Sequence, residues 1–459
     1  MMLMALLGPS ATLAGAAPGV APRKAVSRKA AAPPKAAAPQ KKAPSRKAAE
    51  APPAPTAASP EITAALRDDA RGAMKRFYAA RAFAPLWLRG DRIGPAADSF
   101  LDWVENADLD GLRPRAYDPA DLREFVREAR ATGDPRTLAR AELALSDRFA
   151  RYVRDQRRPG DADMLYADPS LKPRRLKPEQ ILQAAALSGP FADYVADMAW
   201  MSPHYVRLRA LLARAQKAGG DERALDQIRH NLDRARLLPG PWTLHIVVDA
   251  SSARLWYYQG GRQIGTMKVV VGAFETQTPV MAGMLQWAIL NPYWNVPTYL
   301  ARNNIAPKIL SGRSLASMHM EVLSDWTDAA QKVDPAAVNW SAVASGDTEI
   351  RLRELPGGAN SMGRVKFLFP NDEGIYLHDT PNRDLFDKPD RHLSNGCIRL
   401  EDAPALGRWL LRRSITAGSK APEQYVPLPV PVPVYLTYLT ATETDAGPAF
   451  RDDIYRLDQ

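Results

Sequence analysis

The spacing of apolar residues changes at Gly240-Pro241, and this change limits the possible folds more than any other feature of the chain. Before it, from residue 61 to about residue 237, apolar residues recur at helical spacing between breaks rich in Pro and Gly, as in 62–78. After it, β-branched and aromatic residues alternate with polar ones. We therefore predict an α+β fold, with a helical N-terminal region followed by a β-rich C-terminal domain.

Further helices are predicted in the first half of the chain. Their aromatic residues recur with the apolar face, so we interpret them as core residues rather than ligand contacts. We find no chemical motif in this half. The predicted ranges are 138–153, 177–187, 191–198, 205–218 and 222–237.

The second half contains runs typical of strands, divided by turn residues. Ser251-Ser252 and Gly260-Gly261 separate the first three runs, as hairpin turns would. His245 lies within the first run, and we interpret it as a paired histidine on a strand face. The predicted strands span 243–249, 253–258, 263–271, 285–290, 365–369 and 374–378.

Two later segments have a less regular pattern. The run 426–440 alternates apolar residues with Pro, and because Pro cannot donate a ladder hydrogen bond we predict an edge strand there. Residues 308–363 show little periodicity and suggest a long loop. A loop of this length within a compact domain is usually functional.

The chain begins with a short apolar run, residues 1–17, which ends in Ala14-Gly15-Ala16. This run resembles the end of a secretory signal peptide, although the usual basic residues before it are missing; a hydrophobic tail is the alternative. It is too short to span a bilayer as a helix. We therefore predict an exported protein of the periplasm or cell envelope.

Residues 18–60 consist largely of Ala, Pro, Lys and Arg, and we predict a disordered linker because they cannot bury enough apolar surface to offset ordering entropy. Nine Lys/Arg and one acid lie within residues 1–60, so this segment carries +8 of the chain's net charge of +10. The remainder is nearly neutral, which argues against nucleic-acid binding. The linker is either a tether to anionic envelope polymers or a solubilising segment.

Cys397 is the only cysteine of the chain, which excludes an intramolecular disulfide and a four-thiolate zinc site. It follows Gly396, which permits a sharp turn, and His378 ends an apolar run that a strand would present. A nucleophilic cysteine needs a base or cationic partner and backbone donors for an oxyanion. These neighbours favour a catalytic Cys397 over an inert buried cysteine. The histidines show no metal-ligand spacing, and we expect no metal or cofactor.

The combination of His378, fifteen intervening residues and Ser394-Asn-Gly-Cys-Ile-Arg399 resembles the signature of the L,D-transpeptidases of the YkuD type. The family usually has histidine where this chain has Asn395. His392 is a candidate replacement, and a solvated loop histidine is the alternative interpretation.

The helical first half and the segments 231–239 and 291–297 are similar to the larger, YcbB-like members of this family. Those members commonly carry a small three-helix peptidoglycan-binding module before the catalytic domain. Only about a dozen residues separate the predicted helix 205–218 from Asn231, so we expect the module to be absent.

The resemblance implies a domain organisation. A helical scaffold domain at 61–237 would precede a mixed β-sandwich catalytic domain at 238–440. Within the latter, a lid at about 308–363 would cover the active site. A C-terminal extension, 441–459, would pack on the catalytic domain.

The resemblance also implies catalytic roles. Cys397 would be the nucleophile and His378 its proton acceptor and later donor. The amide of Cys397, helped by the Gly396 amide or the Tyr376 hydroxyl, would stabilise the oxyanion. In the family a backbone carbonyl usually orients the histidine; the carboxylates of Asp379 and Asp384 are alternatives, and both are interpreted mainly as solvated loop charges.

Substrate contacts are implied for four residues: Arg399, Ser394, Asn395 and Trp294. Ser394 is expected to fix the turn, and Arg399 either holds the loop or pairs with a substrate carboxylate. Trp294 would line the substrate groove, with a packed core tryptophan as the alternative.

The reaction implied by the family joins two peptidoglycan stem peptides, a donor and an acceptor, through a 3→3 cross-link. A cysteine thioester would form with release of the donor's terminal D-alanine, and carbapenems would acylate the same thiol. Water as acceptor would give a carboxypeptidase, and a lipoprotein lysine would give wall anchoring. A non-catalytic wall-binding protein is the alternative from another class.

Overall fold

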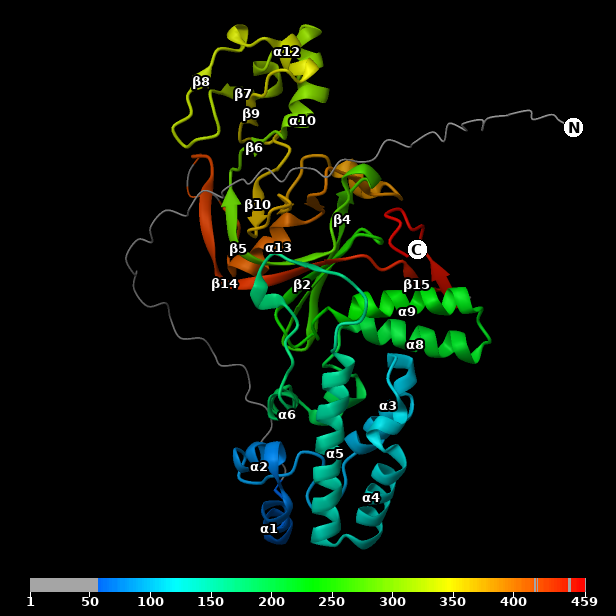
Figure 1. The fold of residues 1–459 in the computed structure, drawn as a ribbon. Coiled ribbons are helices and arrows are strands. Elements are labelled where there is room, and N and C mark those ends of the chain that lie inside the picture. The colour runs from blue at the N-terminus through cyan, green and yellow to red at the C-terminus, as the bar shows by residue number, and fades with distance from the viewer. Residues whose placement is uncertain (1–56, 417, 419, 445–446, 459) are drawn as a thin grey trace, which may run out of the picture. The chain divides into compact units, whose positions relative to one another are not determined.

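A computed structural model describes residues 57–416, 418, 420–444 and 447–458 (Figure 1). The predicted signal peptide at 1–17 and nearly all of the predicted linker at 18–60 lie outside these residues. Among the described residues, no helix combines the length and the apolar character needed to cross a membrane.

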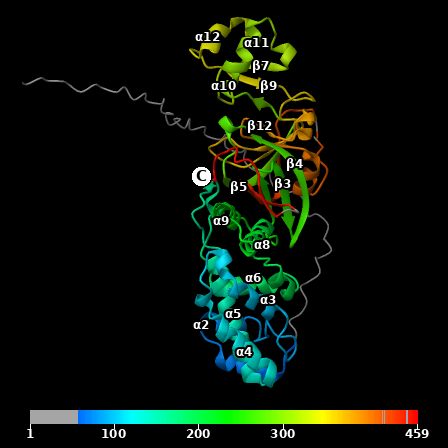
Figure 2. The same ribbon diagram turned by 90° about the vertical axis from the view of Figure 1, so that its right-hand side faces the viewer.

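Helices form the N-terminal half of the described chain, and α4 packs beside α5 in both views (Figures 1 and 2). The predicted helices are present, whereas α3 and α4 lie outside the predicted ranges. The helices are α1 (Pro60–Asp69), α2 (Gly72–Ala79), α3 (Ala96–Glu105), α4 (Pro119–Thr132), α5 (Pro135–Gln156), α6 (Pro178–Leu187), α7 (Phe191–Ala196), α8 (Pro203–Lys217) and α9 (Glu222–Arg236).

Local sequence fixes where the long helices begin. Asp134 accepts hydrogen bonds from the amides of Arg136 and Thr137 at the start of α5, and Ser202 accepts one from Tyr205 at the start of α8. Proline follows each cap as the first helical residue, where no amide hydrogen is needed. The connection between α8 and α9 runs only from residue 218 to residue 221, so no module is inserted there.

One continuous mixed sheet forms the centre of the C-terminal half. The strands pair in the order β5-β10-β11-β13-β4-β3-β2-β14. Because β14 also pairs with β5, the sheet that was expected to form a sandwich closes on itself. The helix α13 (Ala403–Leu411) packs against β14. The strands are β2 (His245–Asp249), β3 (Arg254–Gln259), β4 (Arg262–Gly272), β5 (Met281–Leu290), β10 (Val365–Leu368), β11 (Leu377–His378), β12 (His392–Ser394), β13 (Ile398–Leu400) and β14 (Gln424–Thr437).

The prediction that the proline-rich run is an edge strand is correct for only part of β14. Residues 434–436 pair with both β2 and β5, so this part is internal. The preceding proline-rich part pairs with β5 alone, with a register shift between Pro427 and Val432. The prolines thus occupy the side of the strand where no ladder amide is required.

A short strand corrects the purely helical interpretation of residues 61–237. β1 (Leu165–Tyr166) lies between α5 and α6 and pairs in parallel with β5 at Met281 and Ala282. The chain therefore leaves the helical region after α5, adds a strand beside β5 and returns to α6.

The expectation of a long irregular loop at 308–363 was wrong, because most of this segment belongs to a folded lobe between β5 and β10. We call residues 294–354 the insert lobe. Its sheet has the order β6-β9-β7-β8, and its own core includes Val296, Val322 and Leu352. The elements are β6 (Trp294–Asn295), α10 (Thr298–Leu300), α11 (Ala306–Leu310), β7 (Met320–Leu323), β8 (Lys332–Val333), α12 (Trp340–Ser345) and β9 (Arg351–Glu354).

The C-terminal extension contacts both halves of the chain, not the catalytic domain alone. Its hairpin, β15 (Ala441–Thr444) and β16 (Gly447–Phe450), packs against α8, and Ala441 belongs to the helical core. The amide of Ala441 donates to Asn231 Oδ1 of α9 at 3.1 Å. Tyr455 then enters the core of the sheet and stacks on Tyr438, with ring centroids 4.9 Å apart.

Candidate active site

The register of β11 and β13 brings the predicted catalytic residues together. The two strands are parallel, with Leu377 opposite Ile398 and His378 opposite Arg399. Leu377 and Ile398 are buried in the core. Because successive side chains point to opposite faces of a sheet, the preceding and following positions share the other face. The residues on that face are Tyr376, His378, Cys397 and Arg399.

The turn before Cys397 is built by Ser394. Its hydroxyl donates to the carbonyl oxygen of Cys397 at 2.7 Å and accepts from the Gly396 amide at 3.2 Å. Gly396 adopts a φ of 106°, which an L side chain rarely adopts. Ser394 is buried and its hydroxyl is already bonded within the turn, so it shapes the loop rather than lining the substrate path.

Two threonines that the sequence interpretation missed hold this turn from outside. Thr278 Oγ1 donates to the carbonyl of Gly396 at 2.7 Å, and Thr276 Oγ1 donates to the carbonyl of Ser394 at 2.9 Å. Both threonines follow β4 in a segment without periodicity. Only the three-dimensional contact identifies them, because no local signal links them to a loop more than a hundred residues later.

His378 is buried, and its tautomer follows from its partner. Its Nδ1 lies 2.6 Å from the carbonyl oxygen of Asp379, which can only accept, so Nδ1 carries the hydrogen. Burial, followed by the charge of Arg399, lowers the pKa of His378 to about 3. The imidazole is therefore neutral near pH 7, and Nε2 is left as a proton acceptor.

The thiol of Cys397 is also neutral near pH 7. Burial raises its pKa to about 11, although hydrogen bonding by Tyr376 and the charges of Arg399 and Lys366 act in the opposite direction. The sulfur donates to the carbonyl of Gly374 at 3.5 Å. The site therefore pairs a neutral thiol with a neutral imidazole, which can accept the thiol proton.

The backbone at Cys397 offers one candidate donor for the expected oxyanion site. Within the described part of the chain, the amide of Cys397 donates no hydrogen bond. The Gly396 amide, expected as a second donor, is instead bonded to Ser394 Oγ. Tyr376 lies on the same face, its ring centroid 6.2 Å from that of His378, so its hydroxyl remains a candidate second donor.

The site is electropositive. Arg399 is half-buried, and its guanidinium forms neither an ion pair nor a hydrogen bond with any described residue. Lys366, opposite His378 on β10, is paired with Glu423 at 3.1 Å. The unpaired guanidinium beside the sulfur can stabilise a developing thiolate or receive a substrate carboxylate.

The two acids considered as partners of His378 do not orient it. The carboxylate of Asp379 is buried and accepts from Arg383 at 2.7 Å and from the amide of Arg364 at 2.9 Å. This carboxylate holds the loop after β11 in place. The sequence interpretation of Asp379 as a solvated charge was therefore wrong. Asp384 is exposed. The expectation of a backbone carbonyl as the orienting group is met by Asp379 O.

His392 is not a solvated loop residue either. Its Nδ1 lies 2.6 Å from Asp390 Oδ1, and its ring packs against Tyr455 with centroids 5.5 Å apart. Asn395 is exposed at the tip of the turn, so it takes no part in this contact. His392 supports the nucleophile loop through the C-terminal extension, and its role in place of a family histidine stays a prediction.

Trp294 and His245 have packing roles in the structure. Trp294 is partly buried on β6 and packs against the core of the insert lobe, which agrees with the alternative of a core tryptophan. His245 is fully buried, stacks on Tyr258 with centroids 4.8 Å apart, and places Nδ1 2.7 Å from the carbonyl of Thr243. His245 is the paired strand histidine that was predicted.

Known families match both halves of the chain. A family model described as a scaffold domain matches residues 72–212, and one described as the L,D-transpeptidase catalytic domain, YkuD, matches residues 243–432. A curated protein of Haemophilus influenzae named "Putative L,D-transpeptidase" is 27% identical over 397 residues, which cover 84% of this chain and 78% of that protein.

Solved structures with some likeness include an L,D-transpeptidase from Mycobacterium smegmatis, 13% identical with a TM-score of 0.21 over 42% of this chain and 58% of that one. A mutant L,D-transpeptidase from Enterococcus faecium is 10% identical with a TM-score of 0.18, over 53% of this chain and 89% of that one. Scores this low carry no structural argument, so the family assignment rests on the sequence matches. The chain thus carries a scaffold domain followed by an L,D-transpeptidase catalytic domain of the YkuD family.

Proposed function

We propose that this protein forms 3→3 cross-links between peptidoglycan stem peptides through a thioester on Cys397. The observation that carries this proposal is the shared face of Cys397 and His378, on which a thiol with a free backbone amide lies beside a neutral imidazole. L,D-transpeptidases act on stem peptides, which supplies the substrate class.

In the acylation step, Cys397 Sγ attacks the carbonyl carbon of the third stem residue, a diamino acid, at its L-centre. The thiol proton passes to Nε2 of His378 as the S–C bond forms, and the oxyanion receives hydrogen bonds from the Cys397 amide and the Tyr376 hydroxyl. When the adduct collapses, the C–N bond to the terminal D-alanine breaks. The imidazolium returns the proton to the departing amine.

In the second step, the side-chain amine of a neighbouring stem attacks the thioester. A new C–N bond forms, the S–C bond breaks, and His378 transfers the proton from the attacking amine to the sulfur. A neutral resting pair suits this cycle, because the thiol is ionised only as the substrate arrives. Arg399 provides the cation that stabilises the developing thiolate.

The experiment is mass spectrometry of products after incubation with purified disaccharide-tetrapeptide, comparing wild type with Cys397→Ala. The proposal predicts a dimer lacking one D-alanine, made by the wild type only. Tripeptide without dimer would instead identify a carboxypeptidase, and coupling to a lysine-bearing lipoprotein peptide would identify an anchoring enzyme. Unchanged sacculus binding by both proteins, with no product and no carbapenem adduct, would identify a non-catalytic wall-binding protein.

A further inference from the structure

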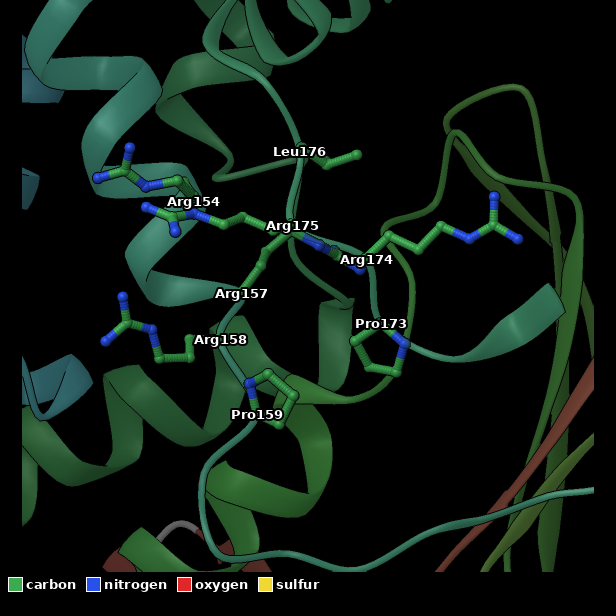
Figure 3. Close-up of a pocket in the computed structure, with 8 residues that line it drawn as sticks. All are labelled: Arg154, Arg157, Arg158, Pro159, Pro173, Arg174, Arg175 and Leu176. Carbon is green, nitrogen blue, oxygen red and sulfur yellow. The ribbon is translucent and has the colours of Figure 1, made fainter. Parts of the chain in front are cut away.

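Arginines gather around a cavity of about 280 Å³ in the helical half, far in sequence from the catalytic motif (Figure 3). Three of them come from the end of α5 and the turn after it, and two from the segment that returns from β1 to α6. Pro159 and Pro173 flank them and stiffen both backbones. The arginines are Arg154, Arg157, Arg158, Arg174 and Arg175.

The positive charge of this cavity is poorly compensated. Asp155 is the acid that its arginines share, at 3.2 Å from Arg154 and 3.8 Å from Arg158. The remaining three, Arg157, Arg174 and Arg175, form no ion pair with any residue that the structure describes.

Some other arginines of the helical half have acidic partners. Arg130 pairs with Asp98 at 2.7 Å, and Arg76 pairs with Glu179 at 3.1 Å. Arg92, Arg115 and Arg223 are exposed and form no ion pair with a described residue, so lack of an acidic partner is not by itself unusual here. What distinguishes the cavity is that several such arginines line one hollow.

Arg157 is the fixed member of the group. Its Nη1 donates to the carbonyl of Trp200 at 2.8 Å, and its side chain is half-buried. Arg175 extends toward Arg154 in Figure 3, whereas Arg174 points away from them. A partly buried cation without a counter-charge is costly, and like charges at one cavity repel, so an anion bound between them would relieve both costs.

We propose that this cavity binds a phosphate group, held by the guanidinium groups of Arg157 and Arg175. The planar fork of arginine matches phosphate oxygens in a bidentate manner. Leu176, which is 39% exposed, adds an apolar surface at the rim. The phosphate can therefore belong to a phospholipid headgroup or to a soluble phosphate ester, and the two sources are separable by experiment.

The test uses the full chain and two double variants with the same change in net charge. Arg157→Gln/Arg175→Gln removes the pocket cations, and Arg123→Gln/Arg127→Gln removes two exposed arginines of α4. Isothermal titration calorimetry with pyrophosphate at fixed ionic strength should show saturable binding by wild type and control. The pocket variant should bind about a hundredfold more weakly, since each hydrogen bond to a charged group typically accounts for about tenfold or more.

Co-sedimentation with phosphatidylcholine vesicles, with and without phosphatidylglycerol, identifies the source. All three proteins carry the basic N-terminal segment, so only the difference between pocket variant and control reports on the cavity. Vesicle binding that is lost in the pocket variant would assign a phospholipid, and pyrophosphate binding alone would assign a soluble ester. Equal pyrophosphate binding by the pocket variant and control, absence of saturable binding, or equal affinity for succinate would overturn the proposal.

Discussion

Thr278 Oγ1 donates a hydrogen bond to the carbonyl oxygen of Gly396 at 2.7 Å, and it accepts one from the amide of Gly272 at 2.9 Å. The end of β4 is thereby tied to the residue before Cys397. The hydroxyl of Tyr455 extends the link, because it donates to Gly272 O at 2.6 Å and accepts from the Thr278 amide at 3.2 Å. The C-terminal extension therefore helps to hold the nucleophile loop.

Thr278→Val should impair both stability and catalysis. Valine fills the same volume but leaves the buried Gly272 amide and Gly396 carbonyl unpaired. Each unpaired group should lower the free energy of unfolding by about 1–3 kcal/mol. A displaced loop should lower kcat about tenfold or more, because reaction geometry is sensitive to small shifts. Thr278→Ser keeps the hydroxyl and should retain most activity. Chemical denaturation and product assays measure both effects, and equal behaviour of the two variants would contradict the account.

Alkylation of Cys397 by iodoacetamide should accelerate steadily with pH. Because the thiol pKa is raised to about 11, the thiolate fraction grows about tenfold per pH unit up to that value. Rates measured by mass spectrometry from pH 6 to pH 9 should therefore rise without a plateau. A plateau that begins near neutral pH would indicate a thiolate–imidazolium pair and contradict a neutral resting site.

Arg399→Met should slow the same alkylation. The charge of Arg399 lowers the pKa of Cys397, so its removal raises that pKa and reduces the thiolate at any given pH, by roughly tenfold for each pKa unit. Arg399→Lys keeps the charge and serves as the matched control. If both variants reacted at the wild-type rate, Arg399 would act on the loop or the substrate and not on the sulfur.

Stability should fall as the pH is lowered from about 6.5 toward 4. Burial lowers the pKa of His378 and His204 to about 3 and that of His245 to about 4. In this window the unfolded chain binds protons that the folded chain does not, so stability is present above the ordinary histidine pKa and is lost below it. Each histidine contributes at most about 1.4 kcal/mol per pH unit to this loss in the free energy of unfolding.

The matched comparison is His245→Phe against His230→Phe, since His230 is exposed. Urea unfolding at pH 7 and pH 5 should show a smaller loss of stability on acidification for His245→Phe than for wild type. His230→Phe should keep the wild-type difference. An unchanged pH dependence in His245→Phe would show that this histidine is not held neutral.

Much of the architecture could be predicted from the sequence, because the decisive signals are local. The switch of spacing at Gly240-Pro241 separates helices from strands, and the hairpins β2–β3 and β3–β4 fall at the predicted turns. Cys397 and His378 were predicted as the catalytic pair from their flanking residues, and the register places them on one face. The apolar spacing of α3 and α4 was also present in the sequence and could have revealed them.

Features that depend on distant contacts could not be predicted. Residues 165–166 have no strand pattern and become β1 only by pairing with β5. The insert lobe lacks a clear period because its elements are short and share a small core. Thr278 and Tyr455 support the nucleophile loop through contacts to Gly396 and Gly272. No spacing in the sequence predicts these contacts. The hydrogen bond from the Gly396 amide to Ser394 Oγ likewise could be found only from the geometry of the turn.

The most direct test of the account is intact-protein mass spectrometry after a brief exposure to disaccharide-tetrapeptide without an acceptor, followed by peptide mapping. Wild type should gain the mass of the donor less D-alanine, located on the peptide that contains Cys397. His378→Gln should acylate far more slowly, and Cys397→Ala should not acylate at all. An acyl group on any other residue, or turnover by Cys397→Ala, would contradict the assignment of Cys397 as the nucleophile.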